Sequence, residues 1–171
     1  AGLYVAIEAL RRAKSVACDL TIVGTTQEEV GLRGARVAGF AVRPEIAVAL
    51  DVTLAVDVPG AQEHEHVTRL GGGVAIKIKD SASISHPALV RFMRELAEER
   101  KIPYQMEILP RGGTDAGALQ LAQEGAAPIT LSLPVRYVHS VVETAHGDDL
   151  EANIALLAAF LETADRVDLG V

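Results

Sequence analysis

The sequence predicts an α/β domain built from a mixed, mostly parallel sheet with helices on both faces. Short apolar runs typical of buried strands alternate with longer segments whose apolar residues recur at helical spacing. A chain of 171 residues suffices for one domain with a sizeable core. Because 49% of the residues are hydrophobic but only 4% are aromatic, we expect a core of Ala, Val, Leu and Ile.

The strands are predicted from short runs of apolar and β-branched residues. They lie at 20–26, 46–50, 75–79, 104–109 and 127–133. The run 46–50 is apolar throughout, which indicates a strand buried on both faces. In the run 75–79, isoleucines alternate with Lys77 and Lys79, as on a strand with one exposed face.

Helices are predicted where apolar residues recur every three or four positions after a capping residue. One helix covers 87–100, with Ser85 as its cap. A shorter helix follows Thr114. The last helix begins at Asp148, and Glu151 stands in position to complete a capping box.

Composition excludes several classes of function. The net charge of −7 argues against a nucleic-acid surface, which needs clustered Lys and Arg. No run approaches the roughly 18 apolar residues of a membrane span, and no secretory signal pattern opens the chain. Cys18 is the only cysteine, which excludes a disulfide within the chain and favours a reducing compartment. We therefore expect a cytoplasmic protein without a nucleic-acid or membrane partner.

Polar and charged residues follow several of the predicted strands. In open α/β sheets the functional groups gather at the carboxyl ends of the strands. A few polar or charged residues near these strand ends are candidates for a catalytic or metal-binding role. In chain order they are Glu28, Glu29, Asp51, the loop 111–115 and His139.

Carboxylates together with an imidazole suit a divalent cation such as zinc, cobalt or manganese. Neighbouring residues in an extended segment point in opposite directions, so one of Glu28 and Glu29 can bind a metal while the other accepts a proton from water. A solvated strand end, where acids are common, explains this pair equally well. Asp51 follows five apolar residues, and a buried carboxylate there needs a partner, a metal or solvent.

The other histidines and a glycine triplet fit structural roles better. His64 and His66 lie in a polar loop. His86 stands in the first turn of a predicted helix, and His146 lies in the loop before the last one. The glycines at 71–73 lack the following helix and lysine of a phosphate loop, which indicates a tight turn.

Five motifs follow one another along nearly the whole chain. They are TTQEEVGLRGA (25–35), IAVALDVTLAVDVPG (46–60), KDSASISHP (79–87), GGTDAGALQLAQEG (112–125) and SLPVRYVHSVVE (132–143). In this order they resemble the motifs of the TET or deblocking aminopeptidases, which are also called glutamyl aminopeptidases or cellulase-M endoglucanases. The resemblance implies a zinc-exopeptidase-like three-layer sandwich.

The resemblance also implies a metal-dependent aminopeptidase that hydrolyses the N-terminal residues of peptides. In such an enzyme two divalent cations, zinc or cobalt, share a bridging water that a glutamate deprotonates. Glu28 matches this general base. Glu29 and His139 match the ligands of one metal, and Asp51 matches a ligand of the other.

The start of the chain departs from the family pattern. Leu3, Ile7 and Leu10 have helical spacing, but no capping residue precedes them. The family also needs a ligating His and a bridging Asp, and both would lie upstream of Ala1, as would its dimerisation domain. The resemblance thus implies that residues 1–171 are the C-terminal part of a catalytic domain, N-terminally incomplete. We expect this chain alone to bind at most one metal ion weakly.

Two other functions stay open. The family forms large assemblies, so a homo-oligomer is implied, and a chain without two of the expected ligands could be a non-catalytic assembly module. Tight metal binding would favour the enzyme. Glycoside hydrolysis, suggested by the endoglucanase name, is least favoured, because Glu28 and Glu29 are adjacent. The two carboxylates of a glycosidase should come from separate positions, roughly 5–9 Å apart.

Overall fold

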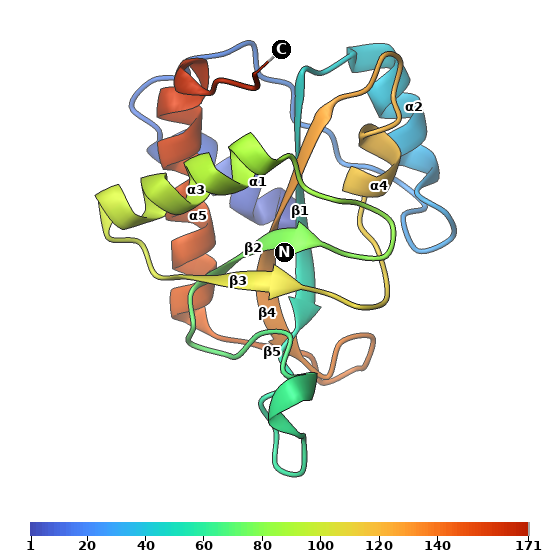
Figure 1. Cartoon of the computed structure of the whole chain (residues 1–171), viewed down its shortest axis with the longest axis vertical. Coiled ribbons are helices and arrows are strands. Elements are labelled where there is room, and N and C mark those ends of the chain that lie inside the picture. The colour runs from blue at the N-terminus through green and yellow to red at the C-terminus, as the bar shows by residue number, and fades with distance from the viewer. Residues whose placement is uncertain (171) are drawn as a thin grey trace.

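The computed structural model of the chain describes residues 1–170 and contains a five-stranded mixed sheet (Figure 1). The strands are β1 (Ile46–Leu54), β2 (Val74–Lys79), β3 (Tyr104–Ile108), β4 (Ala127–Arg136) and β5 (Thr144–Ala145). Their order is β1-β4-β2-β3, with β5 beside β4. β1 runs parallel to β4 along its whole length and β2 runs parallel to β3, whereas β2 and β4 pair antiparallel at two positions. The sheet is therefore mostly parallel, as the sequence predicts.

Helices cover both faces of this sheet. They are α1 (Gly2–Arg12), α2 (Arg33–Val42), α3 (Pro87–Arg100), α4 (Ala116–Leu119) and α5 (Gly147–Thr163). Figure 1 shows α1, α3 and α5 on one side of β1 and β4, and α2 with α4 on the other. α5 packs against α1, α3, β2 and β4, while α4 packs against α2, β1 and β4. The predicted two-sided architecture is confirmed. Within residues 1–170, no helix combines the length and apolar character needed to cross a bilayer.

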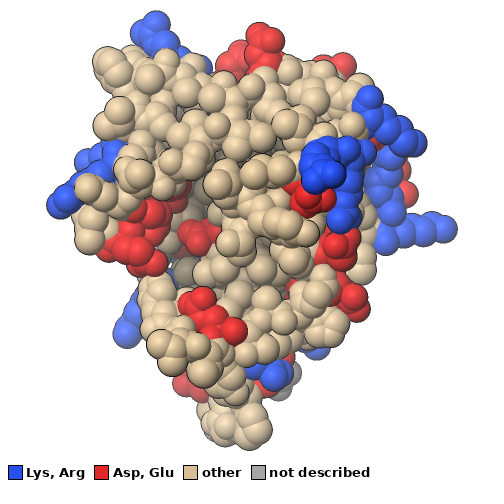
Figure 2. All heavy atoms as spheres, turned by 180° about the vertical axis from the view of Figure 1, so that it is seen from behind, with Lys and Arg blue, Asp and Glu red and all other residues tan. Residues whose placement is uncertain are grey.

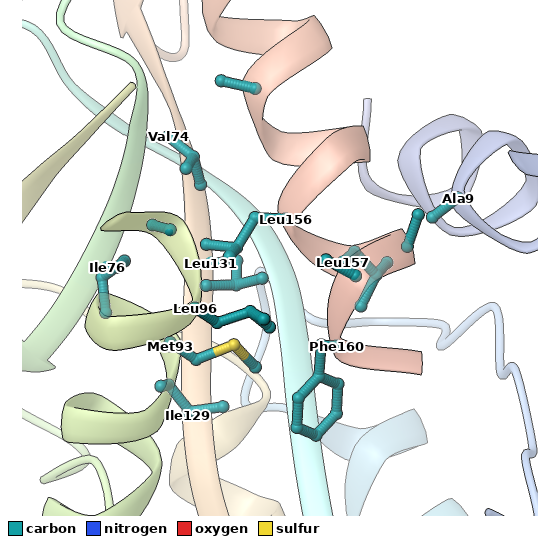
Figure 3. Close-up of a cluster of buried hydrophobic side chains, with 14 of the residues drawn as sticks. Ala9, Val74, Ile76, Met93, Leu96, Ile129, Leu131, Leu156, Leu157 and Phe160 are labelled. Carbon is teal, nitrogen blue, oxygen red and sulfur yellow. The ribbon is translucent and has the colours of Figure 1, made fainter. Parts of the chain in front are cut away.

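The main hydrophobic core lies between the sheet and helices α3 and α5. Figure 3 shows Ile76 of β2 and Leu131 of β4 beside Met93 of α3 and Leu156 and Phe160 of α5. These five side chains are at most 4% exposed. Most of the remaining core residues are Ala, Val, Leu and Ile, as the composition predicts. Burial of this apolar surface is the main stabilising contribution to the fold.

One buried position contradicts the pattern read from β2. The alternation of Ile and Lys predicts Lys77 on an exposed face, but its side chain is fully buried. Its Nζ lies 2.6 Å from Oε1 of Glu107 on β3 and 3.7 Å from Oδ2 of Asp80. Thr53 of β1 donates a further hydrogen bond to Glu107. Because β2 is an inner strand, its lysine is buried and neutralised by carboxylates instead of pointing to solvent.

The first predicted strand is not formed. Residues 20–26 have neither helix nor strand structure, and the side chains of Leu20, Ile22 and Val23 are 38–46% exposed. A strand needs a neighbour that satisfies its backbone N–H and C=O groups. Among residues 1–170, no strand pairs with this segment. An apolar run therefore predicts the tendency to form a strand but not the presence of a partner.

The predicted N-terminal helix is present as α1, but it turns an unexpected face to the protein. It buries Val5 and Ala9 against the neighbouring helix α5. The side chains of Leu3, Ile7 and Leu10, which define its apolar periodicity, are 41–54% exposed. An apolar stripe thus lies on the outer face of the helix.

Two helices near the site differ from the sequence prediction. The sequence does not predict α2, because the helix has no capping side chain that would signal its start. Leu32, the residue before it, has a left-handed φ of 55°. Its packing relies on Gly39, where a Cβ would lie only 2.8 Å from that of Ala122. The helix predicted after Thr114 is shorter than expected, since α4 contains four residues and is followed by turns.

The N-terminal caps of α3 and α5 also differ from the prediction. The N-cap of α3 is His86 instead of Ser85. α5 begins one residue early, and its N-cap is His146, whose Nδ1 accepts a hydrogen bond from the backbone N–H of Asp148 at 3.2 Å. Glu151 forms a salt bridge with α1 and does not complete a capping box. Histidine is an uncommon cap, so the sequence pattern favoured the commoner residues.

Candidate active site

The structure places the four predicted site residues on three separate segments. Glu28 and Glu29 lie in the turn that leads into α2, Asp51 lies within β1, and His139 lies in the loop after β4. Glu28 and Asp51 are half-buried, whereas Glu29 and His139 are exposed. Nε2 of His139 lies 3.1 Å from Oε1 of Glu29, although 110 residues separate them. Two of the predicted ligands are thus in direct contact.

Electrostatic effects connect all four residues. The pKa of Glu28 is raised, first by burial and then by the negative charges of Asp51, Glu29 and Asp115, while His139 opposes this rise. Such effects require the groups to lie near one another. That the four side chains converge on one site stays a prediction.

The pKa of Asp51 is likewise raised, mainly because its carboxyl group is buried. Two features oppose this rise: the backbone N–H of Val52, which donates to Oδ1 at 2.7 Å, and the ammonium of Lys77. The charges of Asp115 and Glu29 add to it. The carboxylate of Asp51 is therefore influenced both by the ammonium of the buried ion pair and by the acidic residues Asp115 and Glu29.

Asp115 is a member of this acidic group that the sequence singled out only as part of a candidate loop. It is the N-cap position of α4, and its Oδ2 accepts a hydrogen bond from the hydroxyl of Thr25. Its Oδ1 is buried and has no hydrogen-bond partner among the described residues. The contact with Thr25 joins the start of α4 to the segment that precedes Glu28 and Glu29.

The turn that presents Glu28 and Glu29 is held by its own backbone. The carbonyl of Glu28 accepts hydrogen bonds from the N–H groups of Gly31 and Leu32, at 3.1 and 2.9 Å. Gln27, before it, has a left-handed φ of 57°. Gly34 approaches the backbone of the segment before the turn so closely that a Cβ would overlap it. Glycine is therefore required there to close the turn.

Side chains of His, Cys, Asp and Glu do not form a complete metal cluster by themselves. Among residues 1–170, no three of them are grouped in a way that could hold a metal ion. The direct contact between Glu29 and His139 therefore joins two residues only. α2 lies at the right of Figure 1 and hence at the left of Figure 2, where carboxylates border a recess.

The structural roles predicted for other polar residues are confirmed. His64 and His66 are exposed in the loop around a short 3-10 turn. The glycines at 71–73 form a turn, in which the backbone N–H groups of Gly71 and Gly73 donate to the buried carboxylate of Asp149 at 2.8 and 2.7 Å.

Comparison with known proteins identifies the family of this chain. Residues 1–156 match the family model described as M42 glutamyl aminopeptidase. The chain belongs to the M42 aminopeptidase family. The resemblance carried by the five sequence motifs is thereby confirmed.

Relatives of this M42 chain include the lysyl aminopeptidase of Pyrococcus furiosus, which is 42% identical over 97% of this chain and 47% of the relative. The structure of aminopeptidase APDkam598 from Desulfurococcus kamchatkensis superposes with a TM-score of 0.92 and is 42% identical, over 94% of this chain and 46% of that one. The TET1 peptidase of Pyrococcus horikoshii, which can assemble into a tetrahedron or a large octahedral shell, superposes with a TM-score of 0.69. It is 35% identical, over 80% of this chain and 39% of its own. The chain spans about half the length of these relatives.

Proposed function

We propose that this M42 chain carries the general base and part of the metal ligands of an aminopeptidase that removes N-terminal residues from peptides. The contact between Glu29 and His139 is the observation that carries this proposal. It joins a carboxylate and an imidazole, the donors that zinc and cobalt favour, from segments far apart in the chain. We further propose that residues 1–171 form the C-terminal part of the catalytic domain; the match spans 47% of the length of the lysyl aminopeptidase.

The site residues fit a divalent cation in charge as well as in donor type. Burial, followed by the negative charges of Asp51, Glu29 and Asp115, raises the pKa of Glu28, so its surroundings disfavour its ionised form. Cations among these groups would offset these negative charges. Glu29 and His139 would hold one cation, and Asp51 would contribute to a second. Cations in such a site activate water and polarise the scissile carbonyl.

Glu28 acts as the general base in this proposal. Its raised pKa makes its carboxylate a stronger proton acceptor than a glutamate in water. It takes a proton from the attacking water and delivers it to the amine that leaves. Because the side chain is half-buried, it is partly shielded from bulk solvent while it holds that proton.

The two adjacent glutamates can be distinguished by isosteric substitution. We expect Glu29→Gln to weaken zinc binding, because an amide oxygen is a poorer ligand than a carboxylate. We expect Glu28→Gln to leave zinc content nearly unchanged and to lower the hydrolysis of aminoacyl nitroanilides by the complete enzyme roughly 10²- to 10⁴-fold. Glu45→Gln, an exposed acid just before β1, is the control. Loss of zinc from Glu28→Gln as severe as from Glu29→Gln would mean that the roles are reversed.

We also propose that the protein works as a homo-oligomer. The TET1 peptidase of Pyrococcus horikoshii can assemble into a tetrahedron or a large octahedral shell, and this chain is 35% identical to it. The exposed apolar stripe of Leu3, Ile7 and Leu10 on α1 is consistent with a surface that is covered in a larger protein.

A further inference from the structure

We propose that Glu143 is a positioning residue for His139: its carboxylate holds the backbone N–H of His139 and so directs the imidazole toward Glu29. This inference rests on the proposed metal-binding role of His139. Oε1 of Glu143 accepts the hydrogen bond from the His139 N–H at 2.7 Å. Contacts in which a carboxylate accepts a backbone N–H are among the stronger hydrogen bonds of proteins.

The two residues lie in a hairpin loop whose base is firmly held. The loop 137–143 joins β4 to β5, and Arg136 pairs with Thr144 at its base. The guanidinium of Arg136 forms two hydrogen bonds to the carboxylate of Asp57, at 2.7 and 3.0 Å. Glu143 directly precedes β5 and is therefore attached to this fixed base. Through its carboxylate it extends that rigidity to the middle of the loop.

The backbone at His139 needs such support. Its φ is 63°, in the left-handed region that costs a non-glycine residue about 1–2 kcal/mol. Tyr137, two residues earlier, is also left-handed, and its carbonyl accepts a hydrogen bond from the Ser140 N–H at 3.1 Å. The hydrogen bond to Glu143 favours the conformation at His139 that the intrinsic backbone preference disfavours.

Packing cannot orient the imidazole instead. The side chain of His139 is 71% exposed, and that of its partner Glu29 is 73% exposed. The direction of an exposed side chain depends on where its backbone places the Cβ atom. If the Glu143 carboxylate is removed, the loop is free to leave the left-handed conformation, and the imidazole then points away from Glu29.

A first test needs no metal. The rate of solvent exchange of the His139 amide proton is measured by NMR in the 171-residue chain. We expect Glu143→Ala to accelerate this exchange roughly 10- to 100-fold, the loss expected for one hydrogen bond to a charged group. We expect Glu143→Gln to restore most of the protection, because its amide oxygen can still accept the bond. Val141→Ala is the matched control, since Val141 lies in the same loop and is 103% exposed. Unchanged exchange in Glu143→Ala would overturn the proposal.

A second test separates positioning from direct metal binding. Zn²⁺ is titrated into the wild type, Glu143→Ala, His139→Ala and the double variant. We expect Glu143→Ala to weaken binding up to about tenfold in the wild-type background and to have no effect once His139 is alanine. The same loss in both backgrounds would mean that Glu143 binds the cation itself, which overturns the positioning role. If His139→Ala leaves the affinity unchanged, the proposed metal site fails, and the amide exchange alone decides the role of Glu143.

Discussion

We expect the fold to lose much of its stability when the buried ion pair between Lys77 and Glu107 is broken. Both side chains are 0% exposed, with Nζ and Oε1 2.6 Å apart. Lys77→Met removes the ammonium and leaves the carboxylate of Glu107 in the interior, with Thr53 as its remaining hydrogen-bond donor. Breaking a buried pair in this way costs about 3–5 kcal/mol, because the charge that is left has no partner. That is a large share of the 5–15 kcal/mol that stabilises a typical domain.

The matched substitution on the other partner shows whether the unpaired charge causes the loss. Lys77→Met/Glu107→Leu removes the carboxylate nearest to the lost ammonium and leaves that of Asp80, whose Oδ2 is 3.7 Å from Nζ in the wild type and whose Oδ1 accepts hydrogen bonds from the backbone N–H groups of Ala82 and Ser83. We therefore expect the double variant to recover part of the stability that Lys77→Met loses. Lys79→Met is the control, because this lysine lies on the same strand but is exposed. We expect it to change the free energy of unfolding by less than about 0.5 kcal/mol.

Urea unfolding followed by circular dichroism measures all four proteins. The reasoning is refuted if Lys77→Met costs less than about 1 kcal/mol, or if the double variant is no more stable than the single one. The first result would mean that solvent reaches the pair, and the second that packing, not charge, sets the cost.

Three further predictions concern other parts of the fold. Arg136 lowers the pKa of Asp57, so this carboxylate stabilises the protein above its unfolded pKa of about 3.9 and ceases to do so as the pH falls through its lower folded value. Asp57→Asn should therefore destabilise the protein near neutral pH and have little effect in strong acid. Thermal unfolding measured across this pH range checks both expectations. Gly71→Ala should lower the free energy of unfolding by about 1–2 kcal/mol, because the glycine has a φ of 73°. Gly73→Ala should lower it more, because the φ of Gly73 is 86° and a Cβ would also overlap the backbone before β3. Equal losses of stability in urea unfolding would contradict this. Ile7→Lys should reduce self-association in sedimentation experiments, because the side chain it replaces is 47% exposed on an apolar stripe; an unchanged sedimentation coefficient distribution would place the contact elsewhere.

Elements with strong local signals were predictable from the sequence. The apolar run that begins at Ile46 and the helix Pro87–Arg100 occur where the periodicity places them. Features that depend on distant residues were not predictable. Lys77 follows an exposed-face pattern, yet it is buried because Glu107 on the next strand neutralises it. The segment 20–26 has a strand-like composition, but among the described residues it has no strand to pair with.

The candidate site shows the same limit. Residue type and position after strands selected Glu28, Glu29, Asp51 and His139 as the groups able to do chemistry. The contact between Glu29 and His139 could not be read from them, because it depends on two turns with left-handed residues that no local motif predicts. That the four side chains form one metal site is still a prediction.

The contact between Glu29 and His139 also has a consequence for folding. It closes a chain segment of 110 residues, and the entropy lost in closing a flexible loop of that length is on the order of 4 kcal/mol. An exposed carboxylate–imidazole contact contributes less than about 1 kcal/mol. The two side chains therefore cannot find each other in a partly folded chain and meet only after the sheet has formed between them. A spectroscopic probe on His139 would then report the folding of the whole domain, although the residue itself adds almost nothing to its stability.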